Sequence, residues 1–408
     1  MSKLQELINK LCPNGVEYLN LGDVCEFKRG KALSSKNVIK GPVPVMAGGQ
    51  KPSCYHNTPN RSGETIVVAG SGAYAGFVTY WKNPIFVSDA FSVHPNDRLL
   101  TKYVFYYLKN FQEKIHATKK GAGVPHVHGS DIAKFSIPVP PIEVQEEIVR
   151  ILDSFSDYAA ELQAELQARK QQYEYYRNLL LTFNPSAYGC GTDDEQKDGV
   201  TTWEGHNYKI EWKKMGDVFE MRNGYTPSKN NSEFWVGGTI PWFRMDDIRE
   251  NGRILSDSIQ HITPSAIKGK GLFEANSFIL ATTATIGEHA LIIADSLANQ
   301  QFTNLKVRKS LSNLLVTKFI YYYMFIVDDF CKKNTNVSGF ASVDMDKLKR
   351  MPFPIPPLEL QEKIVAILDR FETLVNDLTN GLPAEIAAVK DQYEYYRNKL
   401  LTFKKLTA

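Results

Sequence analysis

Two short patterns in the sequence contain residue types that can do chemistry. Residues 70–75, GSGAYA, have the GxGxxA spacing of a dinucleotide-binding turn, and Asp89 follows at the distance expected for a ribose ligand. The strand-like FVTYW comes next, where such a site needs a helix, so we interpret GSGAYA as a tight turn. His126 and His128 have the types and spacing of metal ligands, but no third ligand follows at a useful spacing.

Signatures of catalysis are missing elsewhere in the sequence. It contains no GxSxG nucleophile, no Walker lysine loop, no HExxH helix and no (N/D)PP(Y/F) motif of amino-methyltransferases. We therefore predict a binding protein that is not an enzyme by itself and carries no metal or cofactor.

The residues best suited to bind a polyanion are basic, amide and aromatic residues that interleave on predicted loops. Lys and Arg can neutralise phosphates, while Arg, Asn and Gln can pair with base edges. For any one residue a solvated surface loop is the simpler interpretation, and only the whole set favours nucleic acid. The DNA-binding candidates in the first half are Lys28, Arg29, Lys31, Gln50, Lys51, Tyr55, His56, Arg61, Ser71, Tyr74, Lys119 and Lys120. Those in the second half are Arg222, Asn223, Tyr225, Thr226, Lys229, Trp242, Arg244, Lys268, Lys270, Gln300 and Gln301.

These loops need strands and helices to position them. TIVVAG (65–70) and FVTYW (77–81) predict one hairpin, and FILATT (278–283) and HALIIA (289–294) predict the corresponding one. The apolar, tyrosine-rich residues 319–327 predict a buried helix, because the run is well short of the ~20 residues that span a bilayer. The fold class expected is α+β.

The chain repeats itself. IPVPPIEVQEEIVRILD (137–153) matches FPIPPLELQEKIVAILD (353–369), and QYEYYRNLLLTF (172–183) matches QYEYYRNKLLTF (392–403). Between these anchors the two halves diverge. Each half is thus a module followed by a long helix, and the helices should serve something common to both halves.

Apolar residues at alternating four- and three-residue spacing run through the first long helix from Ile148 to Phe183, with Arg169 as the one exception. Such a spacing predicts a coiled-coil seam, and the simplest partner is the second long helix, packed antiparallel. In the second helix Asn380, Gly381 and Pro383 predict a break or kink.

The two modules carry a net positive charge, whereas the long helices carry a net negative one. Residues 1–140, the first predicted module, hold 17 Lys/Arg against 9 Asp/Glu, and residues 206–356, the second, hold 19 against 15. The central helix (141–186) holds 4 against 8, and the C-terminal helix (357–408) holds 7 against 8.

The composition of residues 187–205 predicts a flexible linker. The five scattered cysteines fit free thiols in a reducing cytoplasm.

Taken together, GAGVPHVHGSDI (121–132) and the doubled PPxExQ and QYEYYR motifs strongly resemble the specificity subunit of type I restriction-modification systems. The resemblance covers essentially the whole chain. It implies two similar β-rich target-recognition domains joined by two long antiparallel coiled-coil helices with pseudo-twofold symmetry. Each domain would read one half of a bipartite double-stranded DNA site.

The resemblance also implies partners. The helices would set the spacing between half-sites and dock two modification (methyltransferase) subunits, which bind S-adenosylmethionine. Restriction subunits that hydrolyse ATP with Mg would join the same complex, and no membrane is involved. The partner-binding candidates are Gln145, Tyr173, Tyr175, Tyr176, Arg177, Gln361, Tyr393, Tyr395, Tyr396 and Arg397.

Two other functions remain possible from the residues alone. One is an RNA-binding or protein-binding scaffold with two modules, and the other is a self-sufficient methyltransferase. Binding to duplex DNA in the presence of RNA competitor separates the first from DNA recognition, and S-adenosylmethionine binding by the chain alone would indicate the second.

Overall fold

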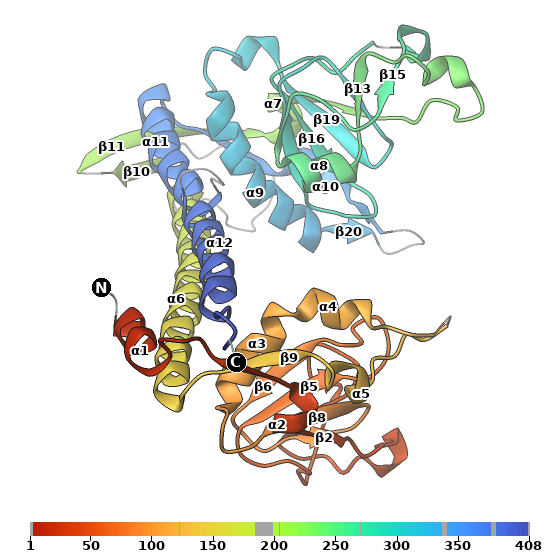
Figure 1. Cartoon of the computed structure of the whole chain (residues 1–408). Coiled ribbons are helices and arrows are strands. Elements are labelled where there is room, and N and C mark those ends of the chain that lie inside the picture. Colours follow the sequence, from red (N-terminus) through yellow and green to blue (C-terminus); the bar gives the residue numbers. More distant parts are fainter. Residues whose placement is uncertain are drawn as a thin grey trace. The chain divides into compact units, whose positions relative to one another are not determined.

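The computed structural model describes residues 3–121, 123–183, 199–203, 205–269, 271–336, 341–376 and 381–406. The chain divides into two compact units. Unit 1 contains Met1–Glu165 and Leu382–Ala408, and unit 2 contains Leu166–Gly381. Each unit therefore combines one module with parts of two long helices (Figure 1).

Unit 1 is built on a four-stranded antiparallel sheet in the order β2-β8-β5-β6. Its central strand β5 is buried on both faces, as the apolar residues Ile66–Ala69 of its sequence TIVVA favour. A second sheet has the order β4-β3-β7, and β1 pairs with β9. The strands of unit 1 are β1 (Glu17–Asn20), β2 (Cys25–Arg29), β3 (Val43–Met46), β4 (Cys54–His56), β5 (Thr65–Ala69), β6 (Val78–Trp81), β7 (Phe86–Val87), β8 (Ala90–Pro95) and β9 (Ser136–Val139). Its shorter helices are α1 (Lys3–Leu11), α2 (Leu21–Val24), α3 (Thr101–Asn110), α4 (Gln112–Ala117) and α5 (Gly129–Ile132).

Unit 2 repeats this plan around a five-stranded sheet in the order β12-β19-β16-β17-β14. Three-stranded sheets β15-β13-β18 and β10-β11-β22 and the pair β20-β21 complete it. Its strands are β10 (Gly199–Trp203), β11 (His206–Lys214), β12 (Phe219–Asn223), β13 (Ile240–Phe243), β14 (Ile254–Leu255), β15 (His261–Ile262), β16 (Ser277–Ala281), β17 (His289–Ile292), β18 (Leu297–Ala298), β19 (Phe302–Val307), β20 (Thr335–Asn336), β21 (Ser342–Val343) and β22 (Pro352–Ile355). Its shorter helices are α7 (Met215–Val218), α8 (Met245–Asn251), α9 (Thr317–Lys333) and α10 (Met345–Arg350).

Both predicted hairpins are confirmed, because β5 pairs antiparallel with β6 and β16 pairs antiparallel with β17. The turn after β5 leads into strand β6, which confirms GSGAYA as a turn and not a dinucleotide site. The predicted tyrosine-rich helix is α9, in which Phe319–Met324 and Val327 are buried and Phe325 and Ile326 are half-buried. No helix among the described residues combines the length and apolar character needed to cross a membrane.

The long helices pack as the seam predicts. α6 (Ile142–Leu181) is one continuous helix of 40 residues. In unit 1 its N-terminal part packs against α12 (Leu382–Leu400), where the rings of Phe155 and Tyr396 stack with centroids 5.5 Å apart. In unit 2 its C-terminal part packs against α11 (Leu358–Asn376), where Tyr176 and Phe371 stack at 5.8 Å. Also in unit 1, the hydroxyl of Tyr158, three residues after Phe155, donates to Glu385, eleven residues before Tyr396, so α6 and α12 run antiparallel.

The expected break in the second long helix is confirmed at Gly381, which is not helical and directly precedes α12, whereas Asn380 and the other residues of 377–380 lie outside the described residues. The expected linker is shorter than predicted at its C-terminal end. Gly199–Trp203 forms β10 and pairs along its whole length with β11, while residues 187–198 and 204 of that linker lie outside the described residues. The Thr and Val residues of GVTTW favour a strand once a partner strand is available.

The same contacts join each long helix to its own module. Asp153 of α6 accepts hydrogen bonds from Lys102 and Tyr106 of α3, both at 2.5 Å. In unit 2, Asp369 of α11 receives the same two kinds of donor from Lys318 and Tyr322 of α9. Burial raises the pKa of both tyrosines, so each hydroxyl stays protonated and donates a hydrogen bond to the carboxylate.

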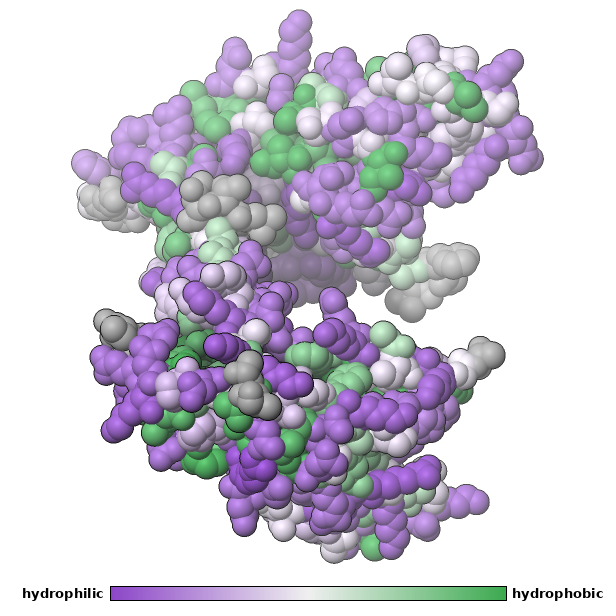
Figure 2. All heavy atoms as spheres, viewed as in Figure 1, coloured by the Kyte–Doolittle hydropathy of each residue, from purple (hydrophilic) through white to green (hydrophobic). Residues whose placement is uncertain are grey.

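Hydrophilic residues cover most of the surface that Figure 2 shows in either unit, and hydrophobic residues gather in small groups. The apolar side chains lie instead in a core cluster within each unit. In unit 1 this core receives Leu401, which directly follows α12, so the C-terminal segment is a structural part of the first module. This arrangement leaves the loops at the strand ends as the places where each module can contact other molecules.

Candidate nucleic-acid and partner interfaces

Four loops of unit 1 that carry DNA-binding candidates converge at one end of the module. The turn after β5 meets the loop after α4, because Gly72 N–H donates to the Pro125 carbonyl at 2.9 Å and Lys119 Nζ donates to the Ala73 carbonyl at 3.1 Å. The loop after β3 reaches the same turn, since a Cβ at Gly48 would overlap the carbonyl oxygen of Ser71. The chain after β2 also joins this group, because Lys31 N–H donates to the Val87 carbonyl.

Most of the DNA-binding candidates of unit 1 are exposed, and four are not. Arg61 is half-buried and its guanidinium donates to Ser92 Oγ at 2.7 Å, to the Asn60 carbonyl and to the carbonyls of Lys28 and Arg29. Such a guanidinium holds the end of β2 in place and has little capacity left for a phosphate. His56 and Ser71 are buried, and Lys119 is half-buried. The exposed candidates are Lys28, Arg29, Lys31, Gln50, Lys51, Tyr55, Tyr74 and Lys120.

Unit 2 builds the corresponding end with the same backbone contacts. Gly30 N–H donates to the Ala90 carbonyl in unit 1, and Gly224 N–H donates to the Phe302 carbonyl in unit 2, at 2.8 and 2.9 Å. At either glycine a Cβ would overlap a backbone carbonyl oxygen, so only glycine allows this close approach. The loops after β2 and β12 are therefore equivalent, although their side chains differ.

Several candidates of unit 2 are used inside the module. Trp242 is 2% exposed, and its indole N–H donates to the Tyr225 carbonyl at 3.0 Å. The Tyr225 hydroxyl in turn donates to Ala266 and accepts from the Lys268 N–H. Arg222 donates to the Leu272 carbonyl and lies over the ring of Phe273, and its burial lowers the pKa of the guanidinium. These residues shape the loops more than they present themselves to a ligand.

The other candidates of unit 2 lie nearer to solvent. Asn223, Lys229, Lys268 and Gln300 are exposed, and Thr226 donates a hydrogen bond to the Gln300 amide oxygen. The half-buried ones are Arg244, whose backbone begins α8, and Gln301, which follows Asn299 in the turn before β19. Lys270 lies outside the described residues.

The repeated QYEYYR segments divide into an inner and an outer side. Tyr175 and Tyr395 are 64% and 62% exposed, and each meets the neighbouring Tyr176 or Tyr396 edge to face at 5.3 Å. Tyr176 and Tyr396 stack on phenylalanines of the opposing helix and are partly exposed. The two copies thus present the same pair of rings in the same geometry.

The inner side of each segment packs on a module. Tyr173 and Arg177 are buried, and the Arg177 guanidinium lies 4.1 Å from the ring centroid of Phe325 on α9. In the other copy Tyr393 and Arg397 are half-buried, and Arg397 Nε donates to the Asn110 amide oxygen on α3. These four residues have a structural contact within their own unit, which periodicity along the helix does not reveal.

Gln145 and Gln361, proposed as partner-binding residues from their repetition, have fully buried side chains. The Gln145 amide donates to the carbonyls of Arg98 and Pro140 and accepts from Leu100 N–H, all within 2.9 Å. Gln361 makes the same three bonds to Leu314, Pro356 and Val316. Their repetition therefore follows from how each long helix begins, and neither side chain reaches a surface.

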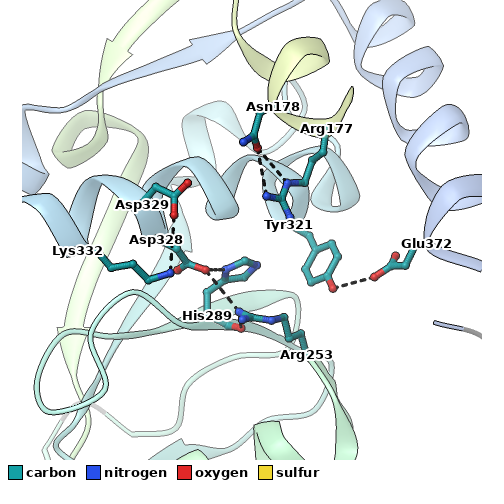
Figure 3. Close-up of polar contacts among 9 residues, drawn as sticks. All are labelled: Arg177, Asn178, Arg253, His289, Tyr321, Asp328, Asp329, Lys332 and Glu372. Carbon is teal, nitrogen blue, oxygen red and sulfur yellow. Dashed lines mark hydrogen bonds and ion pairs between the residues drawn. The ribbon is translucent and has the colours of Figure 1, made fainter. Parts of the chain in front are cut away.

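A buried polar group beneath the QYEYYR segment of unit 2 has no signal in the sequence (Figure 3). His289 of β17 is bonded through Nδ1 to Asp328 of α9 at 2.7 Å, and Arg253 donates to the His289 carbonyl at 3.0 Å. In unit 1 the matching helix position is Gln112, which bonds to Val78 N–H and the Gly76 carbonyl. In unit 2 this position joins β17 to the tyrosine-rich helix α9, and in unit 1 it joins the start of β6 to α4, which directly follows the tyrosine-rich helix α3.

The histidines considered as metal ligands pack on one another. The rings of His126 and His128 are nearly parallel, with centroids 6.4 Å apart. Among the described residues no group of three or more His, Cys, Asp or Glu side chains could hold a metal ion.

The family is shown by a model described as the type I restriction modification DNA specificity domain, which matches residues 13–169 and 208–388. The chain belongs to the type I specificity-subunit family. It is a DNA specificity subunit of a type I restriction-modification system, and the specificity subunit is not itself catalytic.

Relatives of this specificity subunit match all or half of it. The EcoR124I/EcoR124II specificity subunit of Escherichia coli is 31% identical over 99% of the chain and 98% of its own length. The EcoprrI specificity subunit of Escherichia coli is 51% identical over 48% of the chain, and that match spans about half, 51%, of the relative. A chain from a solved structure on complex assembly and conformational transition of the type I R-M system has a TM-score of 0.61 at 19% identity, over 95% of this chain and 98% of that one. This last likeness confirms the predicted fold.

Proposed function

We propose that each module of this specificity subunit reads one half of a bipartite DNA site, while the long helices hold two methyltransferase subunits and set the spacing between the half-sites. Both modules are basic, and each brings exposed lysine, asparagine or glutamine side chains together on glycine-shaped loops. Basic side chains supply affinity for phosphates, and amides supply contacts to base edges. Since the loop sequences differ between the modules, the two half-sites should differ.

The repeated tyrosine pair supports two copies of one partner. Tyr175–Tyr176 and Tyr395–Tyr396 have the same ring separation and nearly the same interplanar angles, 74° and 77°. A surface built twice in one chain fits two copies of the same protein. Tyrosine is among the residues that contribute most to protein interfaces. This doubled, exposed tyrosine pair is the single observation that carries the partner proposal.

The solved type I complex gives the proposal further support, because it shows that a chain of this fold occurs in an assembly of the type I R-M system. For this chain we expect methyltransferase subunits to bind S-adenosylmethionine and restriction subunits to bind ATP and Mg. The chain itself supplies recognition and positioning.

Sequence-specific binding to duplex DNA tests the proposal. The full chain, assembled with its methyltransferase subunits, should bind a duplex containing both half-sites at least tenfold more tightly than a duplex with either half-site scrambled. Excess RNA should not compete. Equal affinity for all three duplexes, or displacement by RNA, would contradict DNA recognition by two modules.

A further inference from the structure

The turn before β8 in unit 1 and the turn before β19 in unit 2 occupy the same place in their modules. Gly70 N–H, which follows the last residue of β5, donates to the Asp89 carbonyl at 3.2 Å. Thr282 N–H, which follows the last residue of β16, donates to the Gln301 carbonyl at 2.9 Å. Asp89 therefore stands in unit 1 where the candidate base-contacting residue Gln301 stands in unit 2.

Asp89 lies among the loops that carry the basic candidates of unit 1. Ala90, directly after it, and Val87, two residues before it, accept backbone hydrogen bonds from Gly30 and Lys31 of the loop after β2. Asp89 itself is exposed, and the buried Ser71 hydroxyl donates to its Oδ2. A carboxylate that a buried hydroxyl orients has a defined direction, as a base-contacting group requires.

Asp89 is an exposed acid at an end of the module where the DNA-binding candidates are mostly basic, amide or aromatic. Nearby lysines that form ion pairs use other acids, since Lys28 pairs with Glu26 and Lys120 with Asp131. A carboxylate repels DNA phosphates, so at a DNA-facing position it weakens non-specific binding. It can accept a hydrogen bond from cytosine N4 in the major groove, and the N6 amino group of adenine is a donor of the same kind.

We propose that Asp89 is a specificity-determining residue of the first module, and that its carboxylate accepts a hydrogen bond from the exocyclic amino group of a cytosine or adenine in the major groove. Ser71 is a positioning residue that orients this carboxylate. The second module carries the neutral amide of Gln301 at the same place, which can both donate and accept. The two modules thus differ in the base chemistry they can read there. This inference rests on the proposed function.

The test uses the full chain assembled with its methyltransferase subunits. The reference site comes from sequencing the methylated motif, and competition binding is then measured on duplexes in which each base pair of both half-sites is varied singly. Asp89→Asn keeps the shape of the side chain and removes its charge. The matched control is Asp97→Asn, because Asp97 is an exposed acid of the same module that follows the far end of β8.

Asp89→Asn should lose about ten- to hundred-fold of the discrimination at one base pair of one half-site, the range for a single good base contact. Ser71→Ala should weaken discrimination at that same base pair and at no other, whereas Asp97→Asn should leave every preference as it was. The inference is overturned if Asp89→Asn keeps all preferences, or if it tightens binding to every duplex equally, as removal of a phosphate-repelling charge would. If the wild-type complex methylates no motif made of two half-sites, the proposed function itself is overturned. That result is separate from any result with the Asp89 variant.

Discussion

Lengthening α6 by one repeat unit should widen the gap between the two half-sites. Residues 160–167 read AELQAELQ within the continuous helix α6, and both leucines, Leu162 and Leu166, are buried. One more AELQ adds four residues at ~1.5 Å each, or about 6 Å. Base pairs rise ~3.4 Å each along DNA, so this length corresponds to about two base pairs.

The assay is sequencing of the methylated motif in cells that carry the full system with the altered chain. The half-sites themselves should be unchanged, and the gap should grow by one or two base pairs. Deletion of residues 160–163 is the matched control, because it keeps the repeat in phase and should narrow the gap by the same amount. An unchanged gap in both variants would refute the idea that α6 sets the spacing.

Three further predictions concern the helices. Tyr175→Ala and Tyr395→Ala should each weaken the binding of one methyltransferase subunit by about 2 kcal/mol or more, and the double variant should weaken both, as measured by sedimentation; full stoichiometry in the double variant would place the interface elsewhere. Gln145→Ala should lower the free energy of unfolding by about 1–3 kcal/mol, because buried backbone groups lose their partners, and an unchanged melting temperature would contradict this role. The hydrogen bonds from Arg150 lower the pKa of Glu147 to about 2, so the stability contributed by Glu147 is complete above about pH 4.5 and lost as the pH falls towards 2. Glu147→Gln should therefore melt with less dependence on acid pH than the parent chain, and identical pH profiles would exclude the ion pair.

Elements with a strong period were predictable from the sequence. The apolar run of β5, the four–three spacing of α6, and the glycine before and proline at the start of α12 each depend on local physics, and each element appears where it was expected. β10 was missed because five residues without apolar periodicity become a strand only when β11 pairs with them.

The candidate sites were less predictable, because residue type does not reveal exposure. Trp242 and Arg61 have types that suit nucleic acid, yet the fold uses both internally. Gln145 is repeated in both halves for a structural reason, and repetition alone cannot separate that from binding. Asp89 was considered only as a ribose ligand, and its place beside Ser71 emerges from the pairing of β5 with β8.

The claim that the modules read DNA while the helices serve common partners is tested most directly by exchanging residues 206–356 for those of a relative with a different target. The measurement is the methylated motif in cells carrying the exchanged chain with its own partner subunits. We expect one half-site to change to that of the relative, with the other half-site and the gap kept. The division of roles between modules and helices would be contradicted if both half-sites changed. It would also be contradicted if methylation continued with neither half-site changed.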